Sequence, residues 1–295
     1  MNTLIELPEE TYTLGDLIKS GSTAEIFEFS TSTFSGVIKL FFPFIPEEWA
    51  RTEYQNTLIA GSKLSFSVQT YGIVKVKSRI GLLLNLSKGI SLSEYVLKHP
   101  SKLLSIPKKM AEIHTQIHEV NTVDELPELE HRFFYSLTRL DFLPDEKKEK
   151  LQQYFHTLPK GTSLCHGDFH FGNLLLSSSK AQSVTLLDWG DTHKGNAMYD
   201  VCRTYLLLKS PSEKPVWIYR FFATFIKRRI AANYLNAYQK ITGCTPQDHE
   251  KWEIIVAVIR LSEIDDIKKR EWWKNIVLQY ITVIQVVNQP SLSSF

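Results

Sequence analysis

The chain has 295 residues, and its 34 basic and 32 acidic side chains leave a formal charge of only +2. This near balance gives no reason to expect a nucleic acid or a membrane surface as a partner, whereas a length of about 300 residues is enough for two lobes with separate cores. The 3 cysteines lie in apolar contexts and are too few for a disulfide framework, so we expect reduced thiols in a cytoplasmic protein.

Neither end of the sequence indicates export or membrane insertion. The first residues lack the basic start and the long apolar stretch of a signal peptide. The apolar segment 276–287 is interrupted by polar residues and is shorter than the roughly 20 residues that a spanning helix needs. We therefore expect a buried helix there.

Residues 12–42 alternate between apolar and polar side chains, which predicts three antiparallel strands. The first two strands are joined by a loop of small residues, Gly21, Ser22 and Thr23. Such a loop can lie over phosphates and donate backbone N–H groups to them, although in most proteins it is only a turn.

A single lysine, Lys39, interrupts the apolar third strand, and a helix is predicted over 47–62. A lysine in such a strand either extends into solvent or points into a cleft and holds an anion. Glu53 of the helix is the expected partner, because a strand lysine paired with a helix glutamate holds the α and β phosphates in kinase-like folds. Glu47 and Glu48 compete for that role.

Two further runs, 70–77 and 80–86, predict an antiparallel pair with a short turn. Polar and glycine residues then lead the chain out of the sheet at 85–89, where we expect a hinge. The backbone of three residues in this segment is the expected contact for adenine: Asn85, Leu86 and Ser87.

A helix is predicted over 92–97, and the helical period dominates beyond Pro100. Helices are predicted there over 104–118, 129–140, 144–156, 198–209, 246–269 and 272–287, with one long helix or two over 215–242. A loop is predicted over 192–196. His114 and His118 are four positions apart, so they could bind a metal ion. No third ligand lies near them in the sequence, which favours a role in helix packing.

The stretch 164–173 and the apolar run that ends at Asp188 carry the clearest chemical signal. Phosphoryl transfer needs a carboxylate that orients the attacking hydroxyl, and it needs oxygen ligands for Mg²⁺. Asp168 can be that carboxylate, and Asn173 and Asp188 can hold the metal ion. An extended approach followed by a turn would point all three side chains at one place.

The chain resembles the aminoglycoside phosphotransferase family, the small-molecule branch of the protein-kinase-like superfamily. The resemblance covers essentially the whole length and rests on Lys39 with Glu53 and on the motifs His166-Gly167-Asp168-x4-Asn173, Leu187-Asp188-Trp189-Gly190 and Gly195-Asn196-x3-Asp200, the last followed by Val201-Cys202-Arg203-Thr204. Phe171 departs from the pattern, since many relatives have proline there, and we expect altered loop packing.

The resemblance implies an α+β, bilobal protein-kinase-like fold. The N-terminal lobe would hold a small antiparallel sheet with one helix, and the larger C-terminal lobe would be mainly helical. The implied parts are a nucleotide-clamping lobe 1–84, a hinge 85–89, and a lobe 90–295 that contains the catalytic loop 164–173, the metal-binding segment 186–191 and the substrate-binding helices.

The resemblance also implies roles for individual residues. Asp168 would accept the proton of the substrate hydroxyl, and Asn173 and Asp188 would hold Mg²⁺. Lys39, paired with Glu53, would hold the phosphates of ATP or GTP. The residues implied to brace the catalytic loop are His166, Asp200 and Arg203.

The expected function is therefore ATP- or GTP-dependent transfer of the γ-phosphoryl group to a hydroxyl of a small molecule. The acceptor is either an antibiotic, an aminoglycoside or a macrolide, with a role in antibiotic resistance, or a metabolite such as choline, homoserine or a sugar derivative. A cationic acceptor needs carboxylates, and the candidates are Glu263, Asp265, Asp266 and Asp191. A solvated helix end is the alternative for the first three. The choice of nucleotide and the oligomeric state do not follow from the sequence.

Three other interpretations stay open. A kinase that acts on a protein is less favoured, because the large helical end and the lack of an activation segment within 188–200 leave little to bind a polypeptide. His166, Asp168 and His170 alternate and, with His193, could form the metal site of a hydrolase. A kinase-like fold could also serve as a binding module. Such a module usually loses the catalytic Asp, the Asn or the metal-binding Asp, and this chain has all three.

Overall fold

The computed structural model describes residues 5–121, 123–177, 183–211, 217–264 and 266–287. Contacts within the chain divide it into two compact units, Met1–Ser101 with His166–Thr192, and Lys102–Cys165 with His193–Phe295. The chain therefore passes from the second unit to the first inside the stretch 164–173. The predicted lobes 1–84 and 90–295 and the hinge 85–89 stay predictions.

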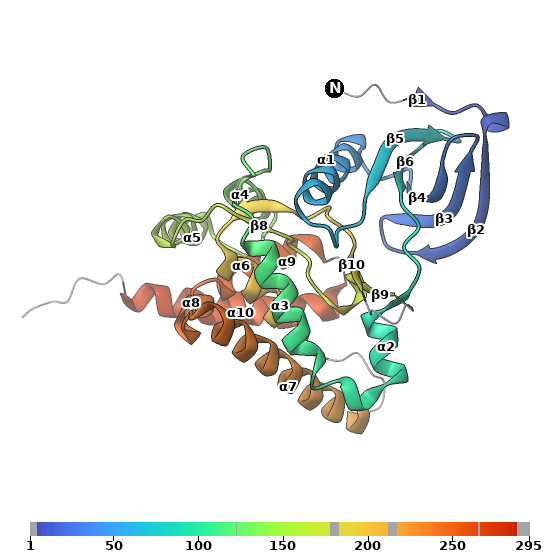
Figure 1. Ribbon diagram of the computed structural model, residues 1–295. Helices are drawn as coiled ribbons and strands as arrows, with labels where there is room; N and C mark the ends of the chain where they lie inside the picture. Colours follow the sequence, from blue (N-terminus) through green and yellow to red (C-terminus); the bar gives the residue numbers. More distant parts are fainter. Residues whose placement is uncertain (1–4, 122, 178–182, 212–216, 265, 288–295) are drawn as a thin grey trace, which may run out of the picture. The chain divides into compact units, whose positions relative to one another are not determined.

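The first unit contains, within the described residues, a sheet of six strands in the order β1-β5-β6-β4-β3-β2 (Figure 1). The strands are β1 Ile5–Glu6, β2 Tyr12–Ser20, β3 Ala24–Thr31, β4 Ser35–Phe41, β5 Thr70–Val76 and β6 Arg79–Leu84. Neighbouring strands are antiparallel, except that β1 pairs with β5 in parallel. The predicted strands are confirmed, whereas β1 is not predictable because two residues carry no period.

Alternation along β4 directs Lys39 toward the helix α1 (Glu47–Lys63). Ile38 packs into the core on one face of the sheet. Phe41 packs on the opposite face, against Tyr54 of α1. Because successive side chains of a strand point to opposite faces, Lys39 shares the face of Phe41. The predicted helix after the third strand is confirmed and lies on the side of this lysine.

The rest of the first unit consists of short strands and helices, some of which lie beside the end of the predicted catalytic loop 164–173. A second sheet, of three antiparallel strands among the described residues, consists of β7 Ile90–Ser91, β9 Leu174–Leu176 and β10 Val184–Leu186. The short helices of this unit are α2 Leu92–Lys98 and the 3-10 turns η1 Glu9–Thr11, η2 Pro100–Lys102 and η3 Phe171–Asn173. Strand β9 begins directly after Asn173, so the sheet fixes the end of the catalytic stretch.

The second unit is helical, and with the first unit it confirms the predicted α+β class. Its helices are α3 Ile106–His118, α4 Leu129–Thr138, α5 Asp145–Thr157, α6 Ala197–Lys209, α7 Trp217–Thr242, α8 Pro246–Glu250, α9 Glu253–Glu263 and α10 Ile267–Val287. Helix α3 lies beside α7 (Figure 1), and the main core lies among α4, α6, α9 and α10. Among the described helices, none is both long enough and apolar enough to cross a bilayer.

Two predictions in the second unit are wrong. The helix predicted over 246–269 is divided into α8, α9 and the start of α10, because a turn at 251–252 ends α8, the chain becomes extended at Ile264, and α10 begins at Ile267. The loop predicted over 192–196 contains strand β11 (His193–Gly195), which pairs with β8 (Ser163–Cys165). Strand β11 is defined by its pairing with a segment distant in the sequence, which a local period does not report.

Candidate active site

His166 ties the catalytic stretch to the chain that leads to Asp188. Its buried ring accepts the backbone N–H of Asp168 at Nδ1, over 3.2 Å, and its Nε2 lies 3.0 Å from the carbonyl oxygen of Leu187. Since Nδ1 is an acceptor, the neutral ring carries its proton on Nε2 and donates it to Leu187. The ring therefore holds the two segments that carry Asp168 and Asp188 together.

Gly167 allows the turn between His166 and Asp168. Its φ angle is +79°, and a Cβ atom at this position would lie 2.2 Å from the carbonyl oxygen of Asp191. Both the left-handed backbone and the close approach require glycine. The middle residue of the His-Gly-Asp motif therefore has a backbone role, and it brings Asp191 beside the catalytic stretch.

Asn173 is oriented by the same loop. Its side-chain Nδ2 donates to the carbonyl oxygen of Asp168 over 3.0 Å and lies 3.5 Å from Oδ2 of the same residue. Its backbone carbonyl accepts the N–H of Leu187 over 2.8 Å. Because the amide nitrogen is engaged inside the loop, Oδ1 is the amide atom that a cation would meet.

Lys39, Glu53 and Asp188 come together from three different elements. The Lys39 Nζ lies 2.6 Å from Oε1 of Glu53 and 3.0 Å from Oδ1 of Asp188. Lys39 and Glu53 are buried, whereas the side chain of Asp188 is 46% exposed. Asp188 also has a φ angle of +64°, a conformation that costs free energy in a residue other than glycine. Strained backbone of this kind is concentrated at functional sites.

The three groups change one another's pKa. Burial lowers the pKa of Lys39, but the carboxylates of Glu53 and Asp188 outweigh burial and raise this pKa well above its ordinary value. Burial raises the pKa of Glu53 to about 7, against the opposing effect of the Lys39 ammonium. Burial also acts to raise the pKa of Asp188, but Lys39 outweighs it and holds that pKa below its ordinary value. Lys39 is therefore cationic and Asp188 ionised at neutral pH.

Asn56, which the sequence does not single out, and Trp189 of the Leu-Asp-Trp-Gly motif hold the segment after Asp188. The side-chain amide of Asn56 donates to the carbonyl oxygens of Trp189 and Thr192, over 3.1 and 3.4 Å. The fully buried Trp189 packs on His166, with 4.7 Å between ring centroids. Asn56 lies three positions after Glu53 and so shares its helix face, which is the one sequence signal that could have found it.

The other predicted nucleotide contacts lie in loops of the first unit. The N–H of Gly21 donates to the carbonyl of Ala24 over 2.9 Å and closes the turn that contains Ser22 and Thr23. Asn85 exchanges hydrogen bonds with the backbone of Gln69, through its own N–H over 3.0 Å and through Oδ1 over 2.8 Å. Leu86 and Ser87 follow in an irregular segment. Their contact with adenine stays a prediction.

Asp200, predicted to brace the catalytic loop, contacts both histidines of α3. Its Oδ2 lies 3.1 Å from Nε2 of His114 and 3.4 Å from Nε2 of His118. The Nδ1 atoms of the two rings contact the hydroxyls of Tyr234 and Tyr238. Among the described residues this is the one group of three side chains arranged to hold a metal ion. Each ring nitrogen already has a hydrogen-bond partner, so the cluster is complete as a buried polar network.

Arg203 and Glu263 form a second charged cluster with Arg132 and Arg260. The two oxygens of Glu263 accept from Arg203 over 2.9 and 3.2 Å, and the Arg260 Nη1 lies 2.6 Å from Oε2. Arg132 contacts Oε1. Arg203 is 0% exposed and the Glu263 side chain 21% exposed. Glu263, predicted to bind substrate, is therefore engaged by three guanidinium groups.

The structure says less about the other carboxylates that the sequence predicts to bind substrate. Asp266 accepts the backbone N–H of Lys269 over 3.2 Å near the start of α10, as a capping residue does. Asp265 lies outside the described residues. The predicted substrate roles of Asp265, Asp266 and Asp191 stay predictions.

The hydrolase interpretation receives no support from the described residues. His166, Asp168 and His170 do not form a group that could hold a metal ion there, because Nε2 of His166 faces the carbonyl of Leu187. His193 belongs to the second unit, on β11. Oxygen donors are instead offered by Asp188 and by Oδ1 of Asn173, and this donor set fits Mg²⁺ rather than Zn²⁺.

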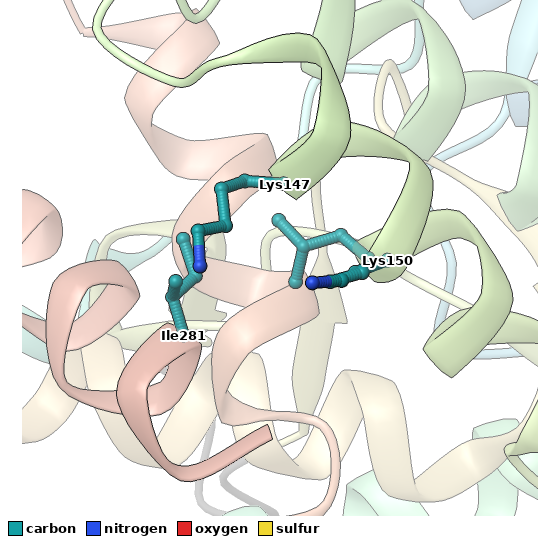
Figure 2. A pocket seen from close by; sticks show the side chains of 4 residues that line it. Lys147, Lys150 and Ile281 are labelled. Atoms are coloured by element: carbon teal, nitrogen blue, oxygen red, sulfur yellow. The ribbon is translucent and has the colours of Figure 1, made fainter. Parts of the chain in front are cut away.

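A hollow between α5 and α10 lacks the kinds of side chain that the candidate active site contains. It is lined by Lys147, Lys150, Leu151 and Ile281. Figure 2 shows Lys147 and Lys150 extending from one helix toward Ile281 of the other. Its lining offers two ammonium groups and aliphatic side chains, without a carboxylate or a hydroxyl that could act as a base or a metal ligand.

Comparison with known proteins relates the chain to phosphotransferases. The model of the phosphotransferase enzyme family (APH) matches residues 82–253. The fold is similar to the ethanolamine kinase of Plasmodium vivax, with a TM-score of 0.58 and 13% identity over 94% of this chain and 83% of that chain. For the choline kinase LicA of Streptococcus pneumoniae the TM-score is 0.58, with 14% identity over 92% and 93% of the two chains.

A third similar structure is the ternary complex of APH(2'')-IIa with streptomycin and ATP, with a TM-score of 0.52 and 15% identity over 92% of both chains. At these identities the similarity shows the fold, and it confirms the predicted protein-kinase-like arrangement of a small sheet followed by helices. A search of curated protein sequences finds no match.

Proposed function

Because the chain belongs to the phosphotransferase enzyme family (APH) and is therefore a small-molecule kinase that acts on a hydroxyl group, we propose that its reaction is centred on Asp168 and on the cluster of Lys39, Glu53 and Asp188. The proposed donor is ATP or GTP with Mg²⁺. The family match confirms the resemblance that the motifs indicate.

One observation carries this proposal: a buried lysine bridges two carboxylates that come from distant parts of the chain. Lys39 and Asp188 are 149 residues apart in the sequence, yet their side chains are in direct contact. A cation held in this way can bind phosphate oxygens, while the exposed Asp188 faces solvent, where a metal ion can reach it. Surface ion pairs rarely combine this burial with strained backbone.

The proposed reaction needs few covalent contributions from the protein. Asp168 accepts the proton of the acceptor hydroxyl as its oxygen attacks the γ-phosphorus, and the bond to the nucleoside diphosphate breaks. Lys39 meets charge on the phosphates, and Glu53 fixes the position of Lys39. Bound Mg²⁺ would neutralise further charge on the phosphates, with Asn173 and Asp188 as its protein ligands.

We propose an amine that carries a hydroxyl group as acceptor. The similar structures are an ethanolamine kinase, a choline kinase and a complex with streptomycin, and each of these small molecules carries a cationic nitrogen group and a hydroxyl group. An amino alcohol is therefore the first candidate and an aminoglycoside the second, ahead of a macrolide, homoserine or a sugar derivative. Asp191, beside the catalytic stretch, is a better candidate for the ammonium contact than Glu263, whose oxygens face three arginines. A cytoplasmic location and the absence of nucleic-acid and membrane partners stay predictions.

A nucleotide-consumption screen tests this function. The purified chain is incubated with Mg·ATP or Mg·GTP and with ethanolamine, choline, streptomycin, homoserine or erythromycin, and nucleoside diphosphate is measured. We expect magnesium-dependent turnover with at least one hydroxylated amine and none above background for Asp168→Ala. If the wild type binds Mg·ATP but consumes no more of it than Asp168→Ala with any acceptor, the proposed function is wrong for these acceptors.

A further inference from the structure

The imidazole of His170 has a tautomer that the loop determines. The turn η3 begins after this residue, and Nδ1 of the ring accepts the backbone N–H of Gly172 over 2.9 Å. A nitrogen that accepts a hydrogen bond carries no proton, so the neutral ring carries its proton on Nε2. His170 therefore presents a donor on the side of the ring that faces away from the turn.

That donor is directed at Asp168. Nε2 of His170 lies 3.3 Å from Oδ2 of Asp168. The same oxygen lies 3.5 Å from Nδ2 of Asn173. Two N–H groups thus approach one oxygen of the carboxylate, and they restrict its rotation about the Cβ–Cγ bond. Both side chains of the contact stay accessible, since His170 is 37% and Asp168 26% exposed.

The ring has little freedom to leave this position. A Cβ atom on Gly172 would lie 2.8 Å from Cε1 and 3.0 Å from Nδ1 of His170. The imidazole therefore packs directly on the glycine backbone, and a side chain at position 172 would displace it. The backbone carbonyl of His170 also accepts the N–H of Asn173 over 3.1 Å, which joins the ring to the loop that holds the amide.

On the premise of the proposed function, we propose that His170 is a positioning residue for the catalytic Asp168. Its Nε2–H holds Oδ2, so that the carboxylate is oriented before the acceptor hydroxyl arrives. The carboxylate then needs no reorganisation when it takes the proton. Misplacement of a reacting group by about 1 Å can cost about 100-fold in rate, so a hydrogen bond that orients the base has a measurable effect.

Two substitutions separate the donor from the acceptor of the ring. His170→Asn places an amide oxygen near the position of Nδ1, so it keeps the acceptor for Gly172 and loses the donor for Asp168. His170→Gln reaches the position of Nε2 with an N–H group, so it keeps the donor and loses the acceptor. A role in the turn alone is rescued by Asn, and a role in positioning Asp168 is rescued by Gln.

The experiment measures kcat, KM and the Kd of Mg·ATP with the best acceptor of the screen. We expect His170→Asn to lose about 10- to 100-fold in kcat with an unchanged Kd, and His170→Gln to stay within about threefold of the wild type. Gly172→Ala, which keeps the imidazole but displaces it from Asp168, should lose kcat as His170→Asn does. His156→Asn, at an exposed histidine of α5, is the matched control and should change nothing.

The proposal is overturned if His170→Asn keeps the wild-type kcat, or if His170→Gln is as impaired as His170→Asn. A screen without turnover for the wild type would contradict the proposed function and not this contact, which is then tested without catalysis. Long-range ¹H–¹⁵N spectra of the wild type should show His170 protonated on Nε2, with a shifted Nε2 signal in Asp168→Ala. A ring protonated on Nδ1 would overturn the proposal whatever the activity.

Discussion

Two clusters of charged side chains, one in each compact unit, use the same ion-pair chemistry in opposite proportions. In the first unit one cation, Lys39, serves two carboxylates, Glu53 and Asp188. In the second unit one carboxylate, Glu263, serves three arginines. The first cluster has an excess of negative groups and an exposed carboxylate, whereas the second has an excess of positive groups around a largely covered one.

The difference separates a site from a structural element. Asp188 adopts a strained backbone and stays 46% exposed, so the metal ion of the proposed function can reach it. Glu263 has guanidinium donors on both oxygens, and Arg203 is fully buried by the contact. A buried pair of this kind is costly to break, because the charge that is left has no partner. Disrupting the first cluster should therefore affect binding and rate, and disrupting the second should affect folding.

The largest effect is expected beside the first cluster, at Asp168→Asn. The substitution keeps the shape of the side chain and removes the base, so kcat should fall by about 100- to 10,000-fold. The Kd of Mg·ATP and the melting temperature should stay unchanged, because the contact of Lys39 with Glu53 and Asp188 is intact. Single-turnover kinetics measure the fall in rate, and isothermal titration calorimetry measures the Kd of Mg·ATP. A variant with full turnover would remove Asp168 from the proposed role.

Asp188→Asn should weaken nucleotide binding at the first cluster and should destabilise the fold less than Glu263→Gln does. Asparagine tolerates the left-handed backbone of this position, and Lys39 keeps Glu53 as its partner. We expect magnesium-dependent affinity for ATP to fall by at least about tenfold, with a smaller loss of unfolding free energy than Glu263→Gln, because one ion pair with Lys39 is lost and the pair with Glu53 stays. Titration of ATP with and without Mg²⁺, beside a urea melt, measures both. A large loss of stability with unchanged affinity would reverse the comparison.

Glu263→Gln should instead destabilise the fold and leave the affinity for Mg·ATP unchanged. Burial acts to raise the pKa of Glu263, but Arg203, Arg132 and Arg260 outweigh it and lower the pKa from 4.5 to about 2. A difference of that size sets an upper limit of about 3 kcal/mol on this stability, because the residue is partly exposed and solvent screens part of the interaction. Because the folded-state pKa is the lower one, this stability is present above the unfolded pKa and is lost as the pH falls toward about 2.

The variant should therefore be less stable than the wild type at pH 7, by up to about 3 kcal/mol, with a smaller difference at pH 3 to 4. Urea unfolding at both pH values measures this difference, and the Kd of Mg·ATP should not change. Glu271→Gln, at an exposed position of α10 without these arginines, is the matched control. A difference that is equal at both pH values would show that the arginines do not act through the ionised carboxylate.

The sequence predicts the first cluster better than the second for a physical reason. Lys39 and Glu53 are visible because a charge in an apolar strand and a carboxylate on the next helix are unusual in place, and Asp188 ends an apolar run. Glu263 looks like any charged helix end, since its partners Arg132 and Arg203 come from distant helices. For the same reason His114 and His118 lack a visible third partner, because Asp200 is 82 residues beyond His118. The short strands β1 and β11 escape prediction because pairing rather than period defines them, whereas β10 lies in an apolar run that predicts a strand.

The smallest effect is expected at Asn56, which supports the first cluster without belonging to it. Asn56→Ala removes the donor to the carbonyls of Trp189 and Thr192, and it should cost about 1 kcal/mol in unfolding free energy. The segment after Asp188 then has a less fixed position, so the affinity for Mg·ATP should fall by about threefold.

Thr57→Ala is the matched control for Asn56→Ala, since Thr57 is equally buried on the same helix but bonds only to the carbonyl of Glu53 within that helix. It should lose similar stability and keep the affinity for Mg·ATP. Equal affinities for the two variants would mean that the segment after Asp188 is held by its own backbone. The strained φ angle of Asp188 would then be maintained by Gly167 and His166 and not by α1. In that case the contact of Lys39 with its two carboxylates would alone distinguish the first cluster from the second.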